Sequence, residues 1–252
     1  TYYRELHQWN QRVNLTAITE CSEVQIKHFL DSLTCCLAIP EGPSAAGKIV
    51  DIGAGAGFPG LPLKLVFPDF QLTLSDSVGK KTAFLRHLLQ VLELPEVVVL
   101  TARAEQLGRA PETRERFDLV LARGVAKLPA LLEYALPLCR VGGKVVAWKH
   151  GGIQQELESA QRALQLLGGR WGQIVPVPIT GLTDNRILVT VVVPDDVVGG
   201  GHHPAADIDP VHLVGVDTAH ERADTEAAQR RRGPLALGEP QPIGVTGIDE
   251  QF

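Results

Sequence analysis

Residues 49–60 limit the possible folds of this 252-residue chain more than any other segment. They read Ile-Val-Asp-Ile-Gly-Ala-Gly-Ala-Gly-Phe-Pro-Gly. A short, mostly apolar strand leads into a glycine-rich turn, and the following proline suits the first turn of a helix. Glycines allow the backbone to approach a ligand closely, and a helix N-terminus offers free N–H groups. The segment therefore predicts a strand, a ligand-binding turn and a helix, as in an α/β fold.

The spacing of the glycines separates two ligand classes. Dinucleotide-binding enzymes carry Gly-x-Gly-x-x-Gly, whereas the sixth position counted from Gly53 is Phe58 in this chain. Gly53, Gly55 and Gly57 instead form Gly-x-Gly-x-Gly after the acidic Asp51, a pattern typical of S-adenosylmethionine sites. A tight turn with a purely structural role is the alternative. We expect S-adenosyl-L-methionine as the cofactor.

Predicted strands and helices alternate along residues 46–194. Several strands are continuous apolar runs, as expected where both faces of a sheet are covered. Residues 78–94 and 152–168 have helical periodicity. The pattern predicts a mostly parallel, seven-stranded, Rossmann-like sheet, closed by an antiparallel pair because no convincing helix separates the last two strands. The predicted strands are Lys48–Gly53, Gln71–Asp76, Val97–Arg103, Phe117–Arg123, Gly143–Lys149, Trp171–Val177 and Arg186–Pro194.

Residues 1–45 are predicted to form a helical segment ahead of this domain. Ser22-x-x-Gln25 matches a capping box and predicts a helix start. The buried face of that helix should hold Ile26, Phe29, Leu30, Leu33 and Leu37. On another face His28, Asp31 and Ser32 are three and four residues apart, so they can act together. The sequence leaves the role of these three residues open.

Further candidate residues follow the carboxyl ends of the predicted strands, where ligands bind in open α/β sheets. Asp76 ends the second strand, where a carboxylate can accept both hydroxyls of an adenosine ribose; a helix N-cap is the alternative. Ala104 and Glu105 follow the third strand, where this fold contacts adenine. Arg123 ends the fourth strand, and burying it would be unfavourable unless it is paired or lies in a cleft.

Three lysines are candidates for contact with phosphate. Lys80 and Lys81 lie in the first turn of a predicted helix, where cations oppose the helix dipole by roughly 0.3–1 kcal/mol. Phosphate would favour them there, and a solvated surface pair is the alternative. Lys149 ends the fifth predicted strand and could reach a substrate at the same edge of the sheet.

Residues 195–252 differ in character from the rest of the chain. They hold eleven acidic residues against four arginines, with five prolines and one aromatic residue. We expect an acidic, mostly disordered tail without catalytic residues. The net charge of −5 for the whole chain therefore conceals a mildly basic remainder, which is compatible with RNA binding.

Composition bears on location and on metal binding. No apolar run reaches the 18 residues that a membrane span needs, and we expect no secretory signal. The chain has no methionine, so we expect Thr1 to lie inside a longer N-terminal helix. The cysteines lack metal-ligand spacing, so we expect reduced thiols, no metal site and a cytoplasmic location. They are Cys21, Cys35, Cys36 and Cys139.

With these motifs in view, residues 7–194 resemble the bacterial ribosomal small-subunit methyltransferase G family, formerly called glucose-inhibited division protein B. The Phe-Pro-Gly extension of the glycine motif and the His-x-x-Asp-Ser-Leu segment are more specific than the glycines alone. Lys81 stands where the family has arginine, and His150 interrupts its Lys-Gly pair. The matching segments include Trp9-Asn10-x-x-x-Asn14-Leu15-Thr16-Ala17-Ile18, His28-x-x-Asp31-Ser32-Leu33, Lys80-Lys81-x-x-Phe84-Leu85, Arg103-Ala104-Glu105, Ala122-Arg123 and Gly142-Gly143.

The resemblance implies a class I methyltransferase that transfers a methyl group from S-adenosylmethionine to N7 of a guanine in 16S rRNA. Because that nitrogen already presents a lone pair, we expect positioning of the reactants and no catalytic acid, base or nucleophile. Arg123 and Lys149 could position the substrate, and Lys80, Lys81 and Lys149 would bind RNA. The expected cofactor contacts are Gly53, Gly55, Gly57, Phe58, Asp76, Ala104, Glu105 and Arg123.

The expected partner is 16S rRNA or a precursor of the small ribosomal subunit, bound by a monomer. Two alternatives remain open. One is an S-adenosylmethionine enzyme acting on a small molecule or a protein. The other is a non-catalytic binding protein that uses the tail to recognise a partner.

Overall fold

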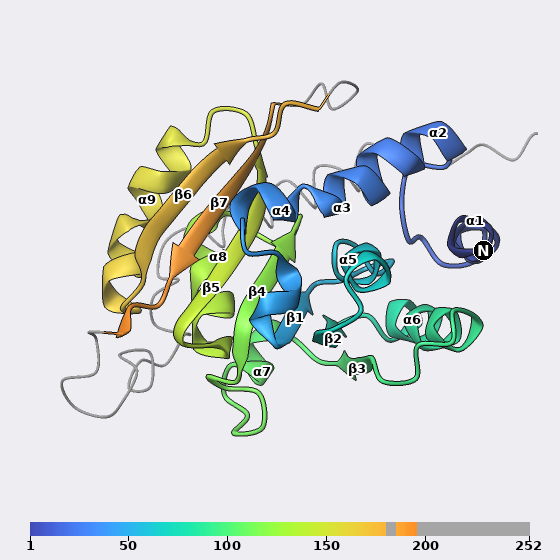
Figure 1. Ribbon diagram of the computed structural model, residues 1–252, viewed down its shortest axis with the longest axis horizontal. Coiled ribbons are helices and arrows are strands. Elements are labelled where there is room, and N and C mark those ends of the chain that lie inside the picture. The colour runs from blue at the N-terminus through green and yellow to red at the C-terminus, as the bar shows by residue number, and fades with distance from the viewer. Residues whose placement is uncertain (180–184, 196–252) are drawn as a thin grey trace, which may run out of the picture. The chain divides into compact units, whose positions relative to one another are not determined.

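The computed structural model describes residues 1–179 and 185–195, and a seven-stranded sheet lies at its centre (Figure 1). The strand order is β3-β2-β1-β4-β5-β7-β6. Neighbours among the first five strands are parallel, whereas β7 is antiparallel to both β5 and β6. The predicted sheet and its antiparallel closing pair are confirmed. The strands are β1 (Lys48–Ile52), β2 (Gln71–Asp76), β3 (Val98–Thr101), β4 (Phe117–Arg123), β5 (Cys139–His150), β6 (Arg170–Pro176) and β7 (Arg186–Val192).

β5 and β3 differ most in length from the predicted strands, because pairing partners and caps set their ends. β5 begins at Cys139, before the predicted Gly143, since Cys139 pairs with Phe117 ahead of a register shift. β3 ends at Thr101, since Arg103 is already the N-cap residue of the next helix.

Helices connect the strands and precede them. Residues 78–94 and 152–168, predicted as helical, contain α6 and α9. The α-helices are α1 (Tyr2–Asn10), α2 (Cys21–Val24), α3 (Asp31–Leu33), α4 (Cys35–Ala38), α5 (Gly60–Val66), α6 (Gly79–Val91), α7 (Ala104–Leu107), α8 (Leu128–Ala135) and α9 (Gln154–Leu166). A π-helix, η1 (Gln25–Leu30), joins α2 to α3, and η2 (Pro43–Ala46) and η3 (Leu136–Leu138) are 3-10 helices. None of the helices in the described ranges is long and apolar enough to cross a membrane.

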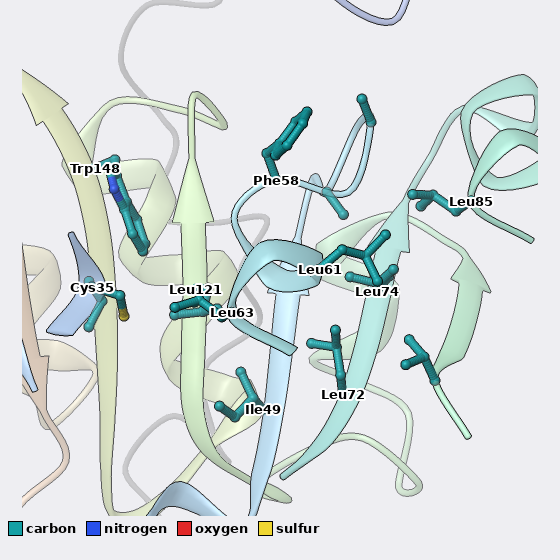
Figure 2. Packing of buried hydrophobic residues seen from close by; sticks show 14 of the residues in the cluster. Cys35, Ile49, Phe58, Leu61, Leu63, Leu72, Leu74, Leu85, Leu121 and Trp148 are labelled. Carbon is teal, nitrogen blue, oxygen red and sulfur yellow. The ribbon is translucent and has the colours of Figure 1, made fainter. Parts of the chain in front are cut away.

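Side chains alternate between two faces of the sheet along each strand. On the first face Ile49 and Leu121 pack with the N-terminal helices, α5 and α6. On the second face Val50 and Val120 pack with α7, α8 and α9. Figure 2 shows part of the first core, with Phe58 beyond the carboxyl end of β1.

The π-helix η1 changes which residues of the N-terminal segment are buried. Its i→i+5 hydrogen-bond pattern accommodates one more residue than an α-helical turn. The predicted positions Leu30 and Leu37 are 41% and 44% exposed, so the prediction was wrong for them. Their neighbours Asp31 and Ala38 are buried instead. Three of the five predicted face residues, Ile26, Phe29 and Leu33, do pack against the core.

The predicted capping box is also wrong. Ser22 lies inside α2, whose N-cap residue is Glu20, and no side chain caps that helix start. At α7 the Gln106 Oε1 accepts a 3.0 Å hydrogen bond from the backbone N–H of the N-cap residue Arg103, which is one half of a capping box.

The strand order reverses at β1, which places a crevice at one edge of the sheet. The chain continues from β1 to β2 and β3 on one side and then crosses to β4 and β5 on the other. Ligands bind outside the carboxyl ends of the strands at such a switch point. The disorder expected for the tail concerns residues 196–252, which lie outside the described residues.

Candidate functional site

A cavity of about 340 Å³ opens beside the carboxyl ends of β1, β2, β3 and β4. Its volume falls within the roughly 300–1,000 Å³ typical of small-molecule sites. A larger hollow of about 470 Å³ lies among Lys48, Gln71 and Arg116 at the opposite edge, and none of the predicted site residues lines it. The predicted cofactor residues that line the first cavity are Gly53, Asp76, Ala104 and Glu105.

Tyr134 also lines this cavity and was not predicted. It lies on α8, after β4, where helix periodicity makes it one of several apolar or aromatic positions. No local signal in the sequence distinguishes it from the leucines beside it, so only the fold reveals its place at the cavity.

The carboxylate of Asp76 is held at the cavity by the backbone. Its Oδ2 accepts a hydrogen bond of 3.0 Å from the Gly55 N–H, and its Oδ1 accepts one of 2.8 Å from the Val78 N–H. The Lys81 Nζ lies 3.9 Å from Oδ2. Each carboxylate oxygen has two lone pairs, so each can still accept a ligand hydroxyl. The N-cap residue of α6 is Val78, not Asp76.

The glycines of the motif have two roles: Gly53 and Gly55 shape the ligand-binding turn, and Gly57 allows close packing. Gly53 and Gly55 have φ of +66° and +59°, in the left-handed region that favours glycine. A Cβ on Gly55 would meet only the Gly53 carbonyl, at 3.8 Å, so this stretch of backbone is open to a ligand. A Cβ on Gly57 would lie 2.5 Å from the Tyr2 Oη and 2.6 Å from the Leu61 Cδ1. Gly57 therefore serves packing of the N-terminal helix.

Phe58, which is buried, and Arg123, which is partly buried, lie in an aromatic cluster and do not line the first cavity. The Phe58 ring stacks on His28 and on Tyr2, with centroid distances of 4.7 and 5.2 Å. The Arg123 guanidinium lies 5.3 Å from the Phe58 centroid, close enough for a cation–π interaction. The Tyr2 hydroxyl donates a 2.6 Å hydrogen bond to the Ala56 carbonyl. The cluster thus fixes the end of the glycine loop against the N-terminal helices.

Asp31 is the anionic centre of this cluster. Its side chain is fully buried, with Oδ2 2.9 Å from the Arg123 Nη1 and Oδ1 3.1 Å from the Arg186 Nε. Burial lowers the pKa of Arg123, and the charge of Asp31 opposes that shift. Trp148 donates to the Asp31 carbonyl at 3.0 Å. The arginine predicted to need a partner or a cleft therefore has a partner, supplied by the His-x-x-Asp-Ser segment.

His28 and Ser32 support Asp31 from the same segment. The His28 Nε2 lies 2.8 Å from the Thr16 Oγ1, and its Nδ1 lies 3.3 Å from the Arg123 Nη2. Burial, and then the charge of Arg123, lower the pKa of His28 to about 4, so the ring is neutral at neutral pH. Ser32 donates to the His28 carbonyl at 2.6 Å. These residues organise the cluster and lie outside the cavity lining.

Asp51, the acidic residue ahead of the glycines, does not line the cavity; its side chain binds the first residue of α5. It is fully buried, and its Oδ2 accepts a 2.8 Å hydrogen bond from the Gly60 N–H. Burial raises the pKa of Asp51 to about 7. A carboxylate at a helix N-terminus also suits the helix dipole.

The three predicted RNA-binding lysines lie in different surroundings. Lys80 is exposed on α6, and Lys81 lines the first cavity beside Asp76. Lys149 is buried, with its Nζ 2.8 Å from the Ala126 carbonyl and 2.7 Å from the Glu156 Oε2. Contact with RNA stays a prediction for all three.

The described part of the chain contains no group of three or more His, Cys, Asp and Glu side chains that could hold a metal ion. All four cysteines are free thiols. Burial raises the pKa of Cys139 to about 12 and that of Cys35 still further, so both are weak nucleophiles at neutral pH.

The first cavity fits S-adenosylmethionine on three counts. The backbone at Gly55 is open to a ligand, the Asp76 carboxylate retains acceptor capacity for ribose hydroxyls, and Ala104 with Tyr134 gives an apolar and aromatic wall for a base. S-adenosylmethionine is the cofactor that the spacing of the glycines predicts. Gly57, Phe58 and Arg123 lie in the cluster behind the cavity, so their direct contact with it stays a prediction.

Known proteins are similar to this chain over most of its described residues. The family rRNA small subunit methyltransferase G matches residues 1–178. Proteins called ribosomal RNA small subunit methyltransferase G from a Roseiflexus species and from Lactobacillus delbrueckii subsp. bulgaricus are 52% and 47% identical. These matches cover 75% and 76% of this chain and 79% and 80% of the relatives.

Solved structures share the fold at low identity. A variant of MtNAS in complex with S-adenosylmethionine is 15% identical, with a TM-score of 0.53 over 76% of this chain and 71% of that chain. A Klebsiella pneumoniae protein described as an O-methyltransferase is also 15% identical, with a TM-score of 0.53 over 77% of this chain and 90% of that chain. The chain has the Rossmann-like fold of class I methyltransferases, and it belongs to the rRNA small subunit methyltransferase G family.

Proposed function

We propose that this protein transfers a methyl group from S-adenosylmethionine to N7 of a guanine in the 530-loop region of 16S rRNA. Membership of the methyltransferase G family carries this proposal. The cavity at the switch point supports it, because its glycine turn, Asp76 and Glu105 come from three successive βα turns. The substrate is 16S rRNA or a precursor of the small subunit.

The residues of the cavity act by binding and orientation. Bound S-adenosylmethionine supplies a methyl group made electrophilic by its sulfonium centre. Asp76 accepts the ribose hydroxyls, the backbone at Gly53 and Gly55 borders the amino acid end, and Ala104 with Tyr134 encloses the base. N7 of guanine already has a lone pair, so no side chain needs to remove a proton before attack. Holding the two reactants in line can account for a large part of the rate.

The cluster around Asp31 serves the reaction indirectly. Arg123 and Phe58 pack together behind the glycine loop, and Asp31 holds Arg123 there. We infer that the cluster fixes the shape of the loop that borders the cofactor. Arg123 is then a positioning residue, and a direct contact with the cofactor or with RNA would use the guanidinium donors that Asp31, Lys27 and His28 leave free.

Lys80 and Lys81 are proposed to contact RNA phosphates beside the cavity. Lys80 is exposed at the start of α6, and no ion pair forms between it and any described residue. Lys81 is near enough to Asp76 to face both the cofactor and an approaching phosphate.

We further propose that the protein works as a monomer in the cytoplasm, where ribosomal subunits are assembled. Light scattering of the purified protein tests the monomer.

Mass mapping of 16S rRNA tests the function. Small subunits from cells with and without this protein are incubated with purified protein and S-adenosylmethionine, and the masses of their 16S rRNA fragments are then compared after digestion. Subunits from cells without the protein should gain one methyl group on a guanine of the 530-loop region. Methylation at N7 should give that base a positive charge. The Gly55→Val variant is the control, since its side chain occupies the ligand-binding stretch of backbone. Methylation of a protein or a small molecule instead, or no binding of S-adenosylmethionine in calorimetry, contradicts the proposal.

A further inference from the structure

A second cavity, of about 210 Å³, lies next to the cofactor cavity. Gly124 and Val125, which follow β4, line both cavities. The second cavity is smaller, as suits one flat base rather than a nucleoside with an amino acid. Its remaining wall comes from the carboxyl end of β5 and the starts of α8 and α9, including Leu131, Lys149 and Glu156.

Three polar side chains line this cavity. His150 lies 3.1 Å from Arg186 through its Nε2, and Lys149 and Glu156 form an ion pair with unused hydrogen-bonding capacity. The Lys149 ammonium donates to the Ala126 carbonyl at 2.8 Å and lies 2.7 Å from the Glu156 Oε2. An ammonium has three N–H donors, so one remains. The Glu156 Oε2 also accepts a 3.1 Å hydrogen bond from the Leu128 N–H. A carboxylate has about four acceptor sites, so the two on Oε1 remain.

The unused donor and acceptors match the polar edge of guanine. Guanine presents N1–H and a 2-amino group as adjacent donors, and O6 beside them as an acceptor. The Oε1 of Glu156 can accept from the two donors, and the Lys149 ammonium can donate to O6. Adenine presents an unprotonated N1 and a 6-amino group at the same places, so it would set acceptor against carboxylate and donor against ammonium. Such mismatches give specificity through repulsion as well as attraction.

We propose that the second cavity holds the target guanine and that Glu156 and Lys149 select it by its N1–H, 2-amino and O6 groups. This inference rests on the proposed function, because it concerns the substrate of the same methyl transfer. N7 makes no contact in this arrangement and stays available to the methyl group. Enzymes that modify a base within RNA or DNA commonly read its Watson–Crick edge in a pocket in this way. Glu156 and Lys149 are therefore specificity-determining residues.

Replacing the target guanine by inosine tests the proposal. Inosine keeps N7, O6 and N1–H and lacks only the 2-amino group, so the reacting nitrogen is preserved. Small subunits are reconstituted with 16S rRNA carrying guanine or inosine at the position found by mass mapping, and methylation is measured under single-turnover conditions. The parent protein should prefer guanine by roughly 5- to 150-fold, the range for a good base contact. Glu156→Ala should reduce this preference to less than about threefold, with unchanged affinity for S-adenosylmethionine.

Two further variants keep the test decisive. Glu156→Ala leaves Lys149 buried without its carboxylate, so the double variant Glu156→Ala/Lys149→Met removes both charges and should lose the preference as well. Glu158 lies on the same helix and is exposed, so Glu158→Ala should keep it.

Three outcomes are distinguished. Equal rates on guanine and inosine with the parent protein overturn the recognition site but leave the proposed function standing. A preference retained in both Glu156 variants shows that the ion pair only joins β5 to α9 and also overturns the inference. No methylation of either RNA by the parent protein contradicts the proposed function itself.

Discussion

Two aspartates at the same edge of the sheet are used in opposite ways. Asp76 lies at the cavity, bound by two backbone N–H groups, and its carboxylate keeps acceptor capacity for a ligand. Asp31 is fully buried, and each of its oxygens faces an arginine, Arg123 or Arg186. The binding carboxylate is held by backbone N–H groups and keeps free acceptor capacity, whereas the charge of the structural carboxylate is paired with other side chains. The difference predicts which property each residue controls.

The largest effect is expected from Asp31→Ala. Removing this carboxylate leaves two arginines buried without their common partner, and breaking a buried ion pair in this way costs about 3–5 kcal/mol. The free energy of unfolding from urea titration should fall by that amount. Asp31→Asn keeps the shape and loses only the charge, so it should be destabilised as well. A loss below about 1 kcal/mol would mean that the arginines find water or other partners.

Asp76→Ala should act on affinity more than on stability. The variant loses two charge-assisted hydrogen bonds to ribose hydroxyls, so the Kd for S-adenosylmethionine should rise about 10- to 100-fold, or roughly 1.5–3 kcal/mol. Val78 is 43% exposed, so water can reach its N–H when the carboxylate is removed. Isothermal calorimetry and urea titration of the same sample check both statements. A Kd within threefold of the parent value would remove Asp76 from the site.

Gly55 and Gly57 allow the same comparison within one motif. In Gly57→Ala the new Cβ meets the Tyr2 hydroxyl and Leu61, so unfolding should become easier by about 1–3 kcal/mol. Gly55→Ala meets open space and adds mainly the strain of its positive φ, about 1 kcal/mol. Gly55→Val should weaken cofactor binding, whereas Gly57→Ala should leave it within a few-fold. The reverse pattern would mean that the ligand lies on the Gly57 side of the loop.

The smallest effect is expected from Lys80→Ala. An exposed lysine contributes little to stability, so the free energy of unfolding should stay within about 0.5 kcal/mol. If Lys80 contacts one phosphate, the slope of log binding constant against log salt should become shallower by about 0.7–0.9. Lys48, exposed at the opposite edge of the sheet, is the matched control, and Lys48→Ala should leave the slope unchanged. An unchanged slope in Lys80→Ala would place the RNA elsewhere.

The sequence was informative where local patterns determine structure. Apolar runs and turn residues predicted the sheet, and strand ends predicted Gly53, Asp76, Ala104 and Glu105 at one cavity. Contacts between distant segments could not be predicted in this way. Arg186 meets Asp31 only because β7 inserts between β5 and β6, and Glu156 meets Lys149 only because α9 begins beside β5.

The prediction of the buried face of the N-terminal segment was partly wrong for a different reason. The predicted face follows an α-helical periodicity of 3.6 residues, whereas the π-helix contains an additional residue that no change in composition marks. The predicted apolar face was correct at Ile26, Phe29 and Leu33 and displaced by one position at Leu30 and Leu37.

The same π-helix makes the length of this segment as important as its composition. An α-helix turns by about 100° per residue, so one residue more or less changes the direction in which all residues beyond it point. The contact of His28 with Thr16 is made from within the π-helix, and the pair between Asp31 and Arg123 is made directly after it. A chain lacking Phe29 or Leu30 would have to give up one of these two contacts. Single-residue deletions here should therefore be tolerated far less well than most substitutions at the exposed Gln25 or Leu30.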